Sequence, residues 1–573
     1  MERYESGVRL QTLKEFFVSF LDAYRYMDIP VRQYVLFYLL PAFVISIGSF
    51  IAAYTSEFPQ TTLYALYGLG VFLPLVALVY PRVLIARRAN EINEKFHLFV
   101  THLTIMSLTN INRVEIFRTL ANEEEYGYLA EEMGRLIGLV DTWNMSLDDA
   151  CRVRSKSVPS DILEDFYQRL AYNVGAGQAM SSFLVKEQDA IIKQFSTTYE
   201  ASLDRLEVIS ELYLSIVLAA VFAVMFAVIA PFLSGTDPIV LIGGVLVAFL
   251  VLQLLFIFIV DAISPEDPVW FQPTAIVIHR NKQIQRLMMI AGVLSGLVTV
   301  VVALVYLGYT PLESDTLPLP IYVAIPTTPL LIPGLYIYYA ERGIMNADAQ
   351  FPSFIRGLGA IESVKQTSTA SVLRTLRKKD FGPLTKDIDS LYRRLNVQID
   401  TSKSWKYFAA ETGSYLIQNF SDMYNFGRSM GGDPEQLGSI ISQNFSEVLK
   451  LREYRTQSTS TLMGILYGIT AAASFSFFVS VEVIRVLIDI TDDVNLDDGT
   501  IGSILNAGIY DVDLIMLLII AVVVLNAGIS SVILRKVDRR YIGGATFHFT
   551  LMTWLGMLMG VLTEYVGNSY LTF

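Results

Sequence analysis

Residues 212–260 read LYLSIVLAAVFAVMFAVIAPFLSGTDPIVLIGGVLVAFLVLQLLFIFIV, two long apolar runs joined by a short turn. An α-helix needs about 20 mostly apolar residues to cross the ~30 Å hydrocarbon core of a bilayer. Leu212–Leu233 and Ile239–Val260 both reach this length, so the chain is predicted to cross a membrane and return. This stretch decides the fold class: an all-α membrane protein.

Working outward from this pair, we find seven further runs of similar length, which gives about nine predicted transmembrane helices. The sixth holds Pro326, Pro329 and Pro333, and proline must kink or break a helix. A broken helix is tolerated at membrane depth only where neighbouring protein covers it. The nine runs are Tyr34–Ala53, Leu63–Tyr80, Leu212–Leu233, Ile239–Val260, Leu287–Gly308, Leu319–Tyr339, Leu462–Val481, Leu514–Leu534 and Ala545–Val566.

The bulk composition agrees with a chain that alternates between lipid and water. Hydrophobic residues make up 53% of the chain and its mean hydropathy is +0.46, yet charged residues still account for 17%. The single cysteine, Cys151, excludes an intramolecular disulfide and a cysteine-built metal site. A net charge of −12 argues against nucleic-acid binding.

Lysine and arginine near the ends of the runs set the predicted orientation, because cytoplasmic loops carry an excess of these residues. They place the N-terminus and both large helical blocks in the cytoplasm, and the C-terminus and an acidic loop (Asp489–Asp498) outside. The basic residues used are Arg82, Arg87, Arg88, Arg280, Lys282, Arg286, Arg342, Arg535, Lys536, Arg539 and Arg540.

Six regions follow. They are a cytoplasmic amphipathic segment (1–33), membrane helices one and two (34–88), a first cytoplasmic helical domain (89–211), membrane helices three to six with a short cytoplasmic loop (212–340), a second cytoplasmic helical domain (341–461) and membrane helices seven to nine (462–573). The apolar stripe of the first region, Leu13–Tyr24, fits a helix on the inner membrane surface or one packed on a cytoplasmic domain.

The two cytoplasmic domains resemble each other at an offset of about 255 residues, which predicts a parallel tandem repeat. Within the first domain, Ser160-Asp161 after Pro159 predicts a helix start, and Gly175-Ala-Gly177 predicts a turn between helices. The matching positions are Phe96 and Phe99 with Phe351 and Phe354, Arg118 with Arg374, Tyr126-Gly127 with Phe381-Gly382, Tyr172 with Phe426, and Gly177 with Gly431.

No catalytic signature is present: the chain has no phosphate loop, nucleophile elbow or zinc-binding helix motif. His97 and His102 are five residues apart, a poor spacing for two metal ligands on one helix face, so packed histidines are expected. Within the spans, Gln253 and Asn526 favour hydrogen bonds between helices over a transport path. The expectation is a protein without catalysis, cofactor or metal.

The two domains differ in the balance of their acidic and basic residues. Acids outnumber bases in the first, while bases prevail in the second, which fits attraction between the two domains, two different faces presented to a partner, or a solvated surface. The basic side chains proposed for docking are Arg374, Arg377, Lys378, Lys379, Arg393 and Arg394.

The helical domains resemble the F-family platform proteins of type II secretion and type IV pilus systems. The resemblance is strongest to the archaeal branch, in particular the platforms of the archaellum, the archaeal flagellum. It rests on Phe96-His-Leu-Phe-Val-Thr-His-Leu, on Arg113-Val-Glu-Ile-Phe-Arg-Thr-Leu120 with Glu125-Tyr-Gly-Tyr-Leu-Ala-Glu-Glu132, and on Val158-Pro-Ser-Asp-Ile-Leu-Glu-Asp-Phe166. The second domain departs from the pattern and has Glu411-Thr-Gly-Ser-Tyr415 in place of the Pro-Ser step.

This resemblance implies a non-enzymatic, dimeric platform in the cell membrane. A cytoplasmic hexameric secretion ATPase would dock beneath it, and pilin-like or archaellin subunits would pass from the bilayer into a filament. An adhesion-pilus or secretion platform is the near alternative. A secondary transporter with parallel repeats is the distant alternative. It predicts buried charges in the spans and short cytoplasmic loops, and the sequence shows neither. A receptor would need a signalling module, and none is readable.

Overall fold

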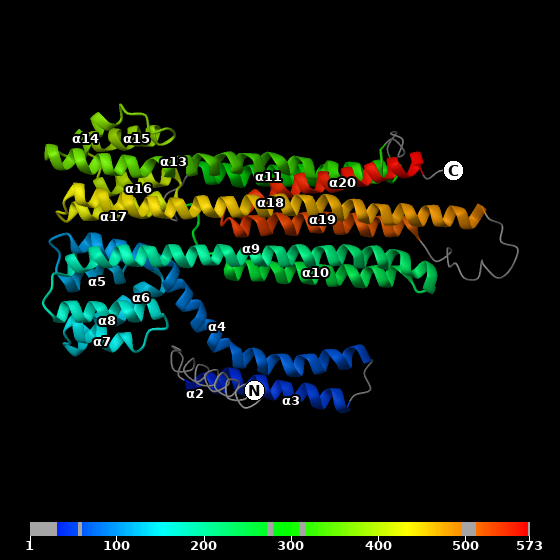
Figure 1. The fold of residues 1–573 in the computed structure, drawn as a ribbon, viewed down its shortest axis with the longest axis horizontal. Coiled ribbons are helices and arrows are strands. Elements are labelled where there is room, and N and C mark those ends of the chain that lie inside the picture. The colour runs from blue at the N-terminus through cyan, green and yellow to red at the C-terminus, as the bar shows by residue number, and fades with distance from the viewer. Residues whose placement is uncertain (1–30, 56–59, 272–278, 310–316, 494–510, 571–573) are drawn as a thin grey trace, which may run out of the picture. The chain divides into compact units, whose positions relative to one another are not determined.

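The computed structural model describes residues 31–55, 60–271, 279–309, 317–493 and 511–570, most of which are helical (Figure 1). No strand occurs among them, apart from one isolated bridge between Trp270 and Ser414. The predicted stripe Leu13–Tyr24 lies outside the described residues, as does the second half of the acidic loop, residues 494–498. The chain divides into two compact units, Met1–Phe195 with Met430–Gly432, and Ser196–Ser429 with Asp433–Phe573.

Among the described residues, seven helices are long and apolar enough to cross a membrane, and they correspond to the third to ninth predicted spans. The first predicted span corresponds to the shorter apolar helix Val35–Ile51. The second, Leu63–Tyr80, falls within the helix Gln60–Ser107, and most side chains of this span lie outside the described ones. The all-α, polytopic membrane fold is therefore confirmed.

In the first unit, short helices pack on the C-terminal half of one long helix. Phe96, Phe99 and Phe166 are buried with their rings in contact, and they form the centre of its core. The elements are α2 (Val31–Tyr34), η1 (Val35–Leu39), α3 (Leu40–Thr55), α4 (Gln60–Ser107), α5 (Arg113–Ala121), η2 (Glu124–Tyr126), α6 (Tyr128–Trp143), α7 (Leu147–Ser155), α8 (Asp161–Gly175) and the start of α9 (Met180–Ser234).

Both local predictions in this unit are confirmed. Helix α8 begins at Asp161, where the Ser160 hydroxyl accepts a hydrogen bond from the Leu163 amide, as an N-cap does. It ends at Gly175, and Gly177 follows with φ of +76°, a left-handed conformation that favours glycine.

The second unit contains the second helical domain and the remaining apolar helices. Phe351, Phe354, Trp405 and Phe408 are buried at the centre of that domain. The elements are α10 (Pro238–Ile263), α11 (His279–Tyr306), α12 (Leu319–Ala324), η4 (Ile325–Leu330), α13 (Leu331–Lys365), α14 (Thr369–Leu376), α15 (Leu384–Asn396), α16 (Thr401–Thr412), α17 (Tyr415–Ser429), α18 (Pro434–Asp493), α19 (Val512–Val537), η6 (Ile542–Gly544) and α20 (Ala545–Tyr570).

The sixth span is broken at its prolines, as predicted: α12 gives way to the 3₁₀ turn η4 and then to α13. Neighbouring helices supply the donors that its backbone needs. Ser295 of α11 donates to the carbonyl of Pro326 (2.7 Å), and Thr550 of α20 donates to that of Thr327 (3.1 Å). The break is therefore covered by protein, the condition for irregular backbone at membrane depth.

Candidate functional site, a basic surface and a buried ion-pair cluster

The six basic residues proposed for docking lie on two neighbouring elements of the second helical domain. Arg374 belongs to α14, Arg377 closes it, and Lys378 and Lys379 follow in the turn before α15. Arg393 and Arg394 occupy the last turn of α15, where positive charge favours the negative end of the helix dipole.

Three of these six cations form ion pairs within the domain. Asp389 binds two of them, Arg377 at 3.1 Å and Arg393 at 2.5 Å. Arg394 is bonded to Glu411, and its guanidinium lies 5.2 Å from the ring centre of Tyr407. Arg377 therefore links α14 to α15 and Arg394 links α15 to α16, whereas Arg393 pairs within α15.

The other three basic side chains are Arg374, Lys378 and Lys379. All are exposed, and no carboxylate of the described residues lies within ion-pair distance of them. Lys379 lies over the ring of Phe381, 5.2 Å from its centre. We call these three residues the α14 basic surface, the part of the predicted set whose charge is available to a partner.

In the first turn of α15, the carboxyl of Asp387 is partly buried near Glu411. Partial burial and the nearby charge of Glu411 raise the pKa of Asp387 to about 6, although Lys386, Arg280 and Arg394 act in the opposite direction. A carboxyl of this kind changes charge close to neutrality and would alter the charge of the domain next to the basic surface.

A second candidate lies where the apolar helices meet this domain, and sequence reasoning did not find it. Glu341, one of the first residues after the sixth span, is fully buried and pairs with Arg535 at 2.6 Å. The same carboxylate accepts hydrogen bonds from the indole of Trp270 (3.1 Å) and the amide of Tyr541 (3.2 Å). One acid therefore joins α13, the end of α19 and the segment after α10.

A neighbouring group centres on Arg452 of α18. Its guanidinium binds Asp267 through two hydrogen bonds, of 2.7 and 2.6 Å, and Asp348 of α13 at 3.0 Å. Arg452, Asp267 and Asp348 are 6, 7 and 1% exposed, so all three charges are withdrawn from water. Together with Glu341 and Arg535 they form what we call the buried ion-pair cluster.

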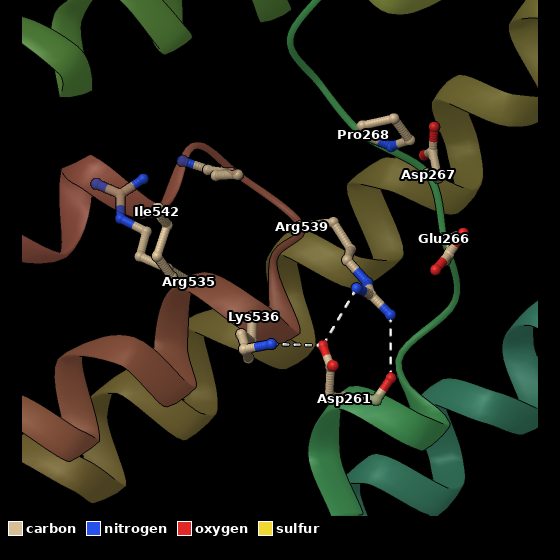
Figure 2. A pocket seen from close by; sticks show the side chains of 9 residues that line it. Asp261, Glu266, Asp267, Pro268, Arg535, Lys536, Arg539 and Ile542 are labelled. Atoms are coloured by element: carbon tan, nitrogen blue, oxygen red, sulfur yellow. Dashed lines mark hydrogen bonds and ion pairs between the residues drawn. The ribbon is translucent and has the colours of Figure 1, made fainter. Parts of the chain in front are cut away.

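A cavity of about 390 Å³ adjoins the cluster (Figure 2). Within it Asp261, at the end of α10, pairs with Lys536 (2.8 Å) and Arg539 (3.3 Å). No group of three or more metal-binding side chains was found among the described residues. The lining residues are Asp261, Glu266, Asp267, Pro268, Arg535, Lys536, Arg539, Arg540 and Ile542.

The sequence did carry a signal for this cluster. Arg535, Lys536, Arg539 and Arg540 were interpreted only as markers of orientation, but Asp261 and Glu341 also stand within two residues of an apolar run. Acids and bases that recur at span ends can pair, since all lie at the same depth. Arg452 and Asp348 had no such signal, because they lie within long helices among other charges.

The histidines and span amides have structural partners. The His97 ring stacks on Phe195, with ring centres 3.7 Å apart, and Nδ1 of His102 lies 3.0 Å from the Tyr126 hydroxyl. Burial lowers the pKa of His102 to about 4. Gln253 donates a 2.6 Å hydrogen bond to Asn526, which confirms the predicted link between spans.

Comparison with known proteins places these features in context. The family model described as "Type II secretion system (T2SS), protein F" matches residues 99–228. The chain is 30% identical over 555 residues to Flagella accessory protein J of Methanococcus voltae, covering 96% of this chain and 99% of that protein. It is 31% identical over 551 residues to Flagella accessory protein J of Methanocaldococcus jannaschii, covering 94% and 96%. No solved structure matches the chain.

Proposed function

This chain belongs to the family of the archaeal Flagella accessory protein J, and from that premise we propose that it is the membrane platform on which an archaellum or a related pilus-like filament is assembled. The platform has no catalytic activity of its own. A cytoplasmic hexameric ATPase drives it, and filament subunits are the cargo. The helical domains face the cytoplasm, and the C-terminus faces outside.

The observation that carries this proposal is the continuity of helices between the domain and the spans. Helix α18 runs unbroken for 60 residues, from the second domain through the seventh predicted span and beyond its end at Val481. At 1.5 Å per residue it is about 90 Å long, roughly three times the hydrocarbon thickness. A rod of this length moves as one body, so a force on the domain reaches the bilayer.

The ATPase docks, in this proposal, on the α14 basic surface. Arg374, Lys378 and Lys379 are exposed and keep their charge available, whereas the paired Arg377, Arg393 and Arg394 contribute mainly to the internal structure of the domain. Complementary charge speeds encounter and fixes orientation, so the facing surface of the ATPase is expected to be acidic.

The two domains are proposed to be copies of one unit that now serve different roles. Phe99 and Tyr126 contact edge to face at 5.6 Å, and Phe354 and Phe381 do so at 5.7 Å. In each pair the second aromatic residue is followed by a glycine with positive φ: Gly127 (+53°) follows Tyr126, and Gly382 (+59°) follows Phe381. Only the second copy has the basic surface, so only it is proposed to bind the ATPase. The platform acts as a dimer.

The test is charge reversal on the full-length protein in membranes. Arg374→Glu with Lys378→Glu is expected to lower co-purification of the ATPase by roughly tenfold, because attractive charges become repulsive ones. Lys403→Glu with Lys406→Glu is the matched control: it makes the same charge change at exposed sites on α16 of the same domain. Equal loss in both variants, or in neither, would refute docking at the α14 surface.

A further inference from the structure

The segment Ser264–Phe271, which we call the tether, follows α10 and forms no helix. Connecting segments normally run over the surface, because their backbone polar groups need hydrogen-bond partners. The tether is instead buried at Ser264, Asp267 and Trp270, which are 2, 7 and 8% exposed, whereas Glu266 and Pro268 are exposed. Its partners therefore decide what it is fixed to.

Two arginines of α18 hold its middle. Arg452 binds the Asp267 carboxylate through two hydrogen bonds and donates another to the carbonyl of Pro268 (2.9 Å). Arg455 donates to the carbonyls of Asp267 and Pro265, both at 3.0 Å. Charged donors make stronger hydrogen bonds than neutral ones, so this is a firm attachment.

The start of the tether is bound to the end of α19. The hydroxyl of Ser264 donates to the carbonyls of Lys536 (3.3 Å) and Val537 (3.2 Å). In return Arg539 donates to the carbonyls of Ser264 (2.7 Å) and Asp261 (3.1 Å). Figure 2 shows Arg539 reaching the end of α10 just below the extended stretch that carries Glu266, Asp267 and Pro268.

The far end of the tether pairs with the second helical domain. The amide of Phe271 donates to Gly413 (2.9 Å) and the amide of Tyr415 donates to Val269 (3.1 Å), which makes a single antiparallel bridge to the turn between α16 and α17. The indole of Trp270 is fixed by its hydrogen bond to Glu341. The segment therefore reaches from two apolar helices to the domain with every part of it attached.

We propose that the tether is a rigid coupling element that carries displacement of the α16–α17 turn directly to the ends of α10 and α19. This inference rests on the proposed platform function and adds a second path, beside the continuous helices, from the domain to the membrane. The α16–α17 turn and α18 can then move only together with the spans, because no part of the connection is slack.

The first test loosens the tether and leaves the docking surface intact. Asp267→Asn keeps the shape of the side chain and leaves Arg452 paired with Asp348, and Arg455→Lys keeps the charge but removes the second donor. In host cells that lack their own copy, the double variant should reduce filament number by roughly tenfold or more, with membrane abundance and ATPase co-purification within about twofold. Glu447→Gln, an exposed α18 acid paired with Lys450, is the control and should change nothing.

Unchanged filament number in the double variant would overturn the coupling role. If instead the unaltered protein neither binds the ATPase nor is needed for filaments, the platform function itself fails, a distinct result. A second measurement needs no variant: hydrogen exchange of the peptide spanning the tether in the full-length protein. The amide of Phe271, which donates to Gly413, should exchange at least about 100-fold slower than a free amide, both with and without the ATPase. Rapid exchange in either state would show that the link is slack.

Discussion

Glu341 and Arg535 form a 2.6 Å ion pair between residues 194 positions apart in the chain, and both side chains are almost fully buried, at 0 and 3% exposure. A buried pair adds little net stability over a well-packed apolar pair, because both ions lose their hydration. Its value lies in geometry, since the carboxylate also holds Trp270 and the amide of Tyr541. It fixes α13, α19 and the tether in one arrangement.

Removing one member of this pair should be far more harmful than removing both. Glu341→Gln leaves the Arg535 guanidinium buried without its carboxylate, and breaking such a pair typically costs about 3–5 kcal/mol. The expected result is a clear fall in melting temperature of the detergent-solubilised protein. The double variant Glu341→Gln with Arg535→Gln should recover part of that loss, whereas no recovery would mean that the two charges do not act on each other.

The closest approach between α13 and α18 gives a second prediction. A Cβ atom at Gly359 would collide with the carbonyl oxygen of Pro434 and lie 3.3 Å from the Cα of Gly438. Gly359→Ala should therefore destabilise the protein by about 1–3 kcal/mol through overpacking.

The control for this change is on the same helix. Gly343 has no atom within 4 Å of an added Cβ, so Gly343→Ala should raise stability by up to about 1 kcal/mol through helix propensity alone. Thermal unfolding of both variants side by side measures the difference. Equal and favourable shifts would show that the two helices are further apart than the structure places them.

The fold was largely readable from the sequence because membrane spans depend on local composition. The length of an apolar run, and the prolines within it, determine a span or its break without reference to distant residues. The break at Pro326 and Pro329 was found in this way, and the single amides Gln253 and Asn526 were interpreted as hydrogen-bonding groups between helices. Thr550 and the face of α20 that covers the break were not predicted, because packing between distant helices leaves no local pattern in the sequence.

The candidate site was readable only in part, for the same reason. Charge counting found the six basic residues but could not separate the exposed Arg374 from Arg394, which is bonded to Glu411. The tether was not predicted from the sequence. Its polar sequence is typical of a surface loop, and the arginines of α18 that bind its middle lie about 185 residues later in the chain.

Stability should depend on pH through His102. Burial lowers its pKa from 6.5 to about 4, so between these values the unfolded chain binds a proton that the folded chain does not. The free energy of unfolding should therefore fall as pH drops from 6.5 towards 4, and level off below that.

His102→Gln isolates this contribution, because other groups, such as Asp387, titrate in the same range. The stability difference between the variant and the unaltered protein, measured by chemical unfolding at several pH values, should shrink as pH falls through the window. A difference independent of pH would mean that His102 is protonated equally in both states.

Substitution of the amide pair in the spans distinguishes a structural role from a transport path. Gln253 and Asn526 are 1 and 6% exposed and bonded to each other at 2.6 Å, so each supplies the other with the partner that lipid cannot. A double-mutant cycle with Gln253→Leu and Asn526→Leu should give a coupling energy of about 0.5–1.7 kcal/mol. Filament number should hold in the double variant, because two leucines pack without unpaired polar groups. A folded, abundant double variant that assembles no filaments would assign these amides a role beyond holding α10 against α19.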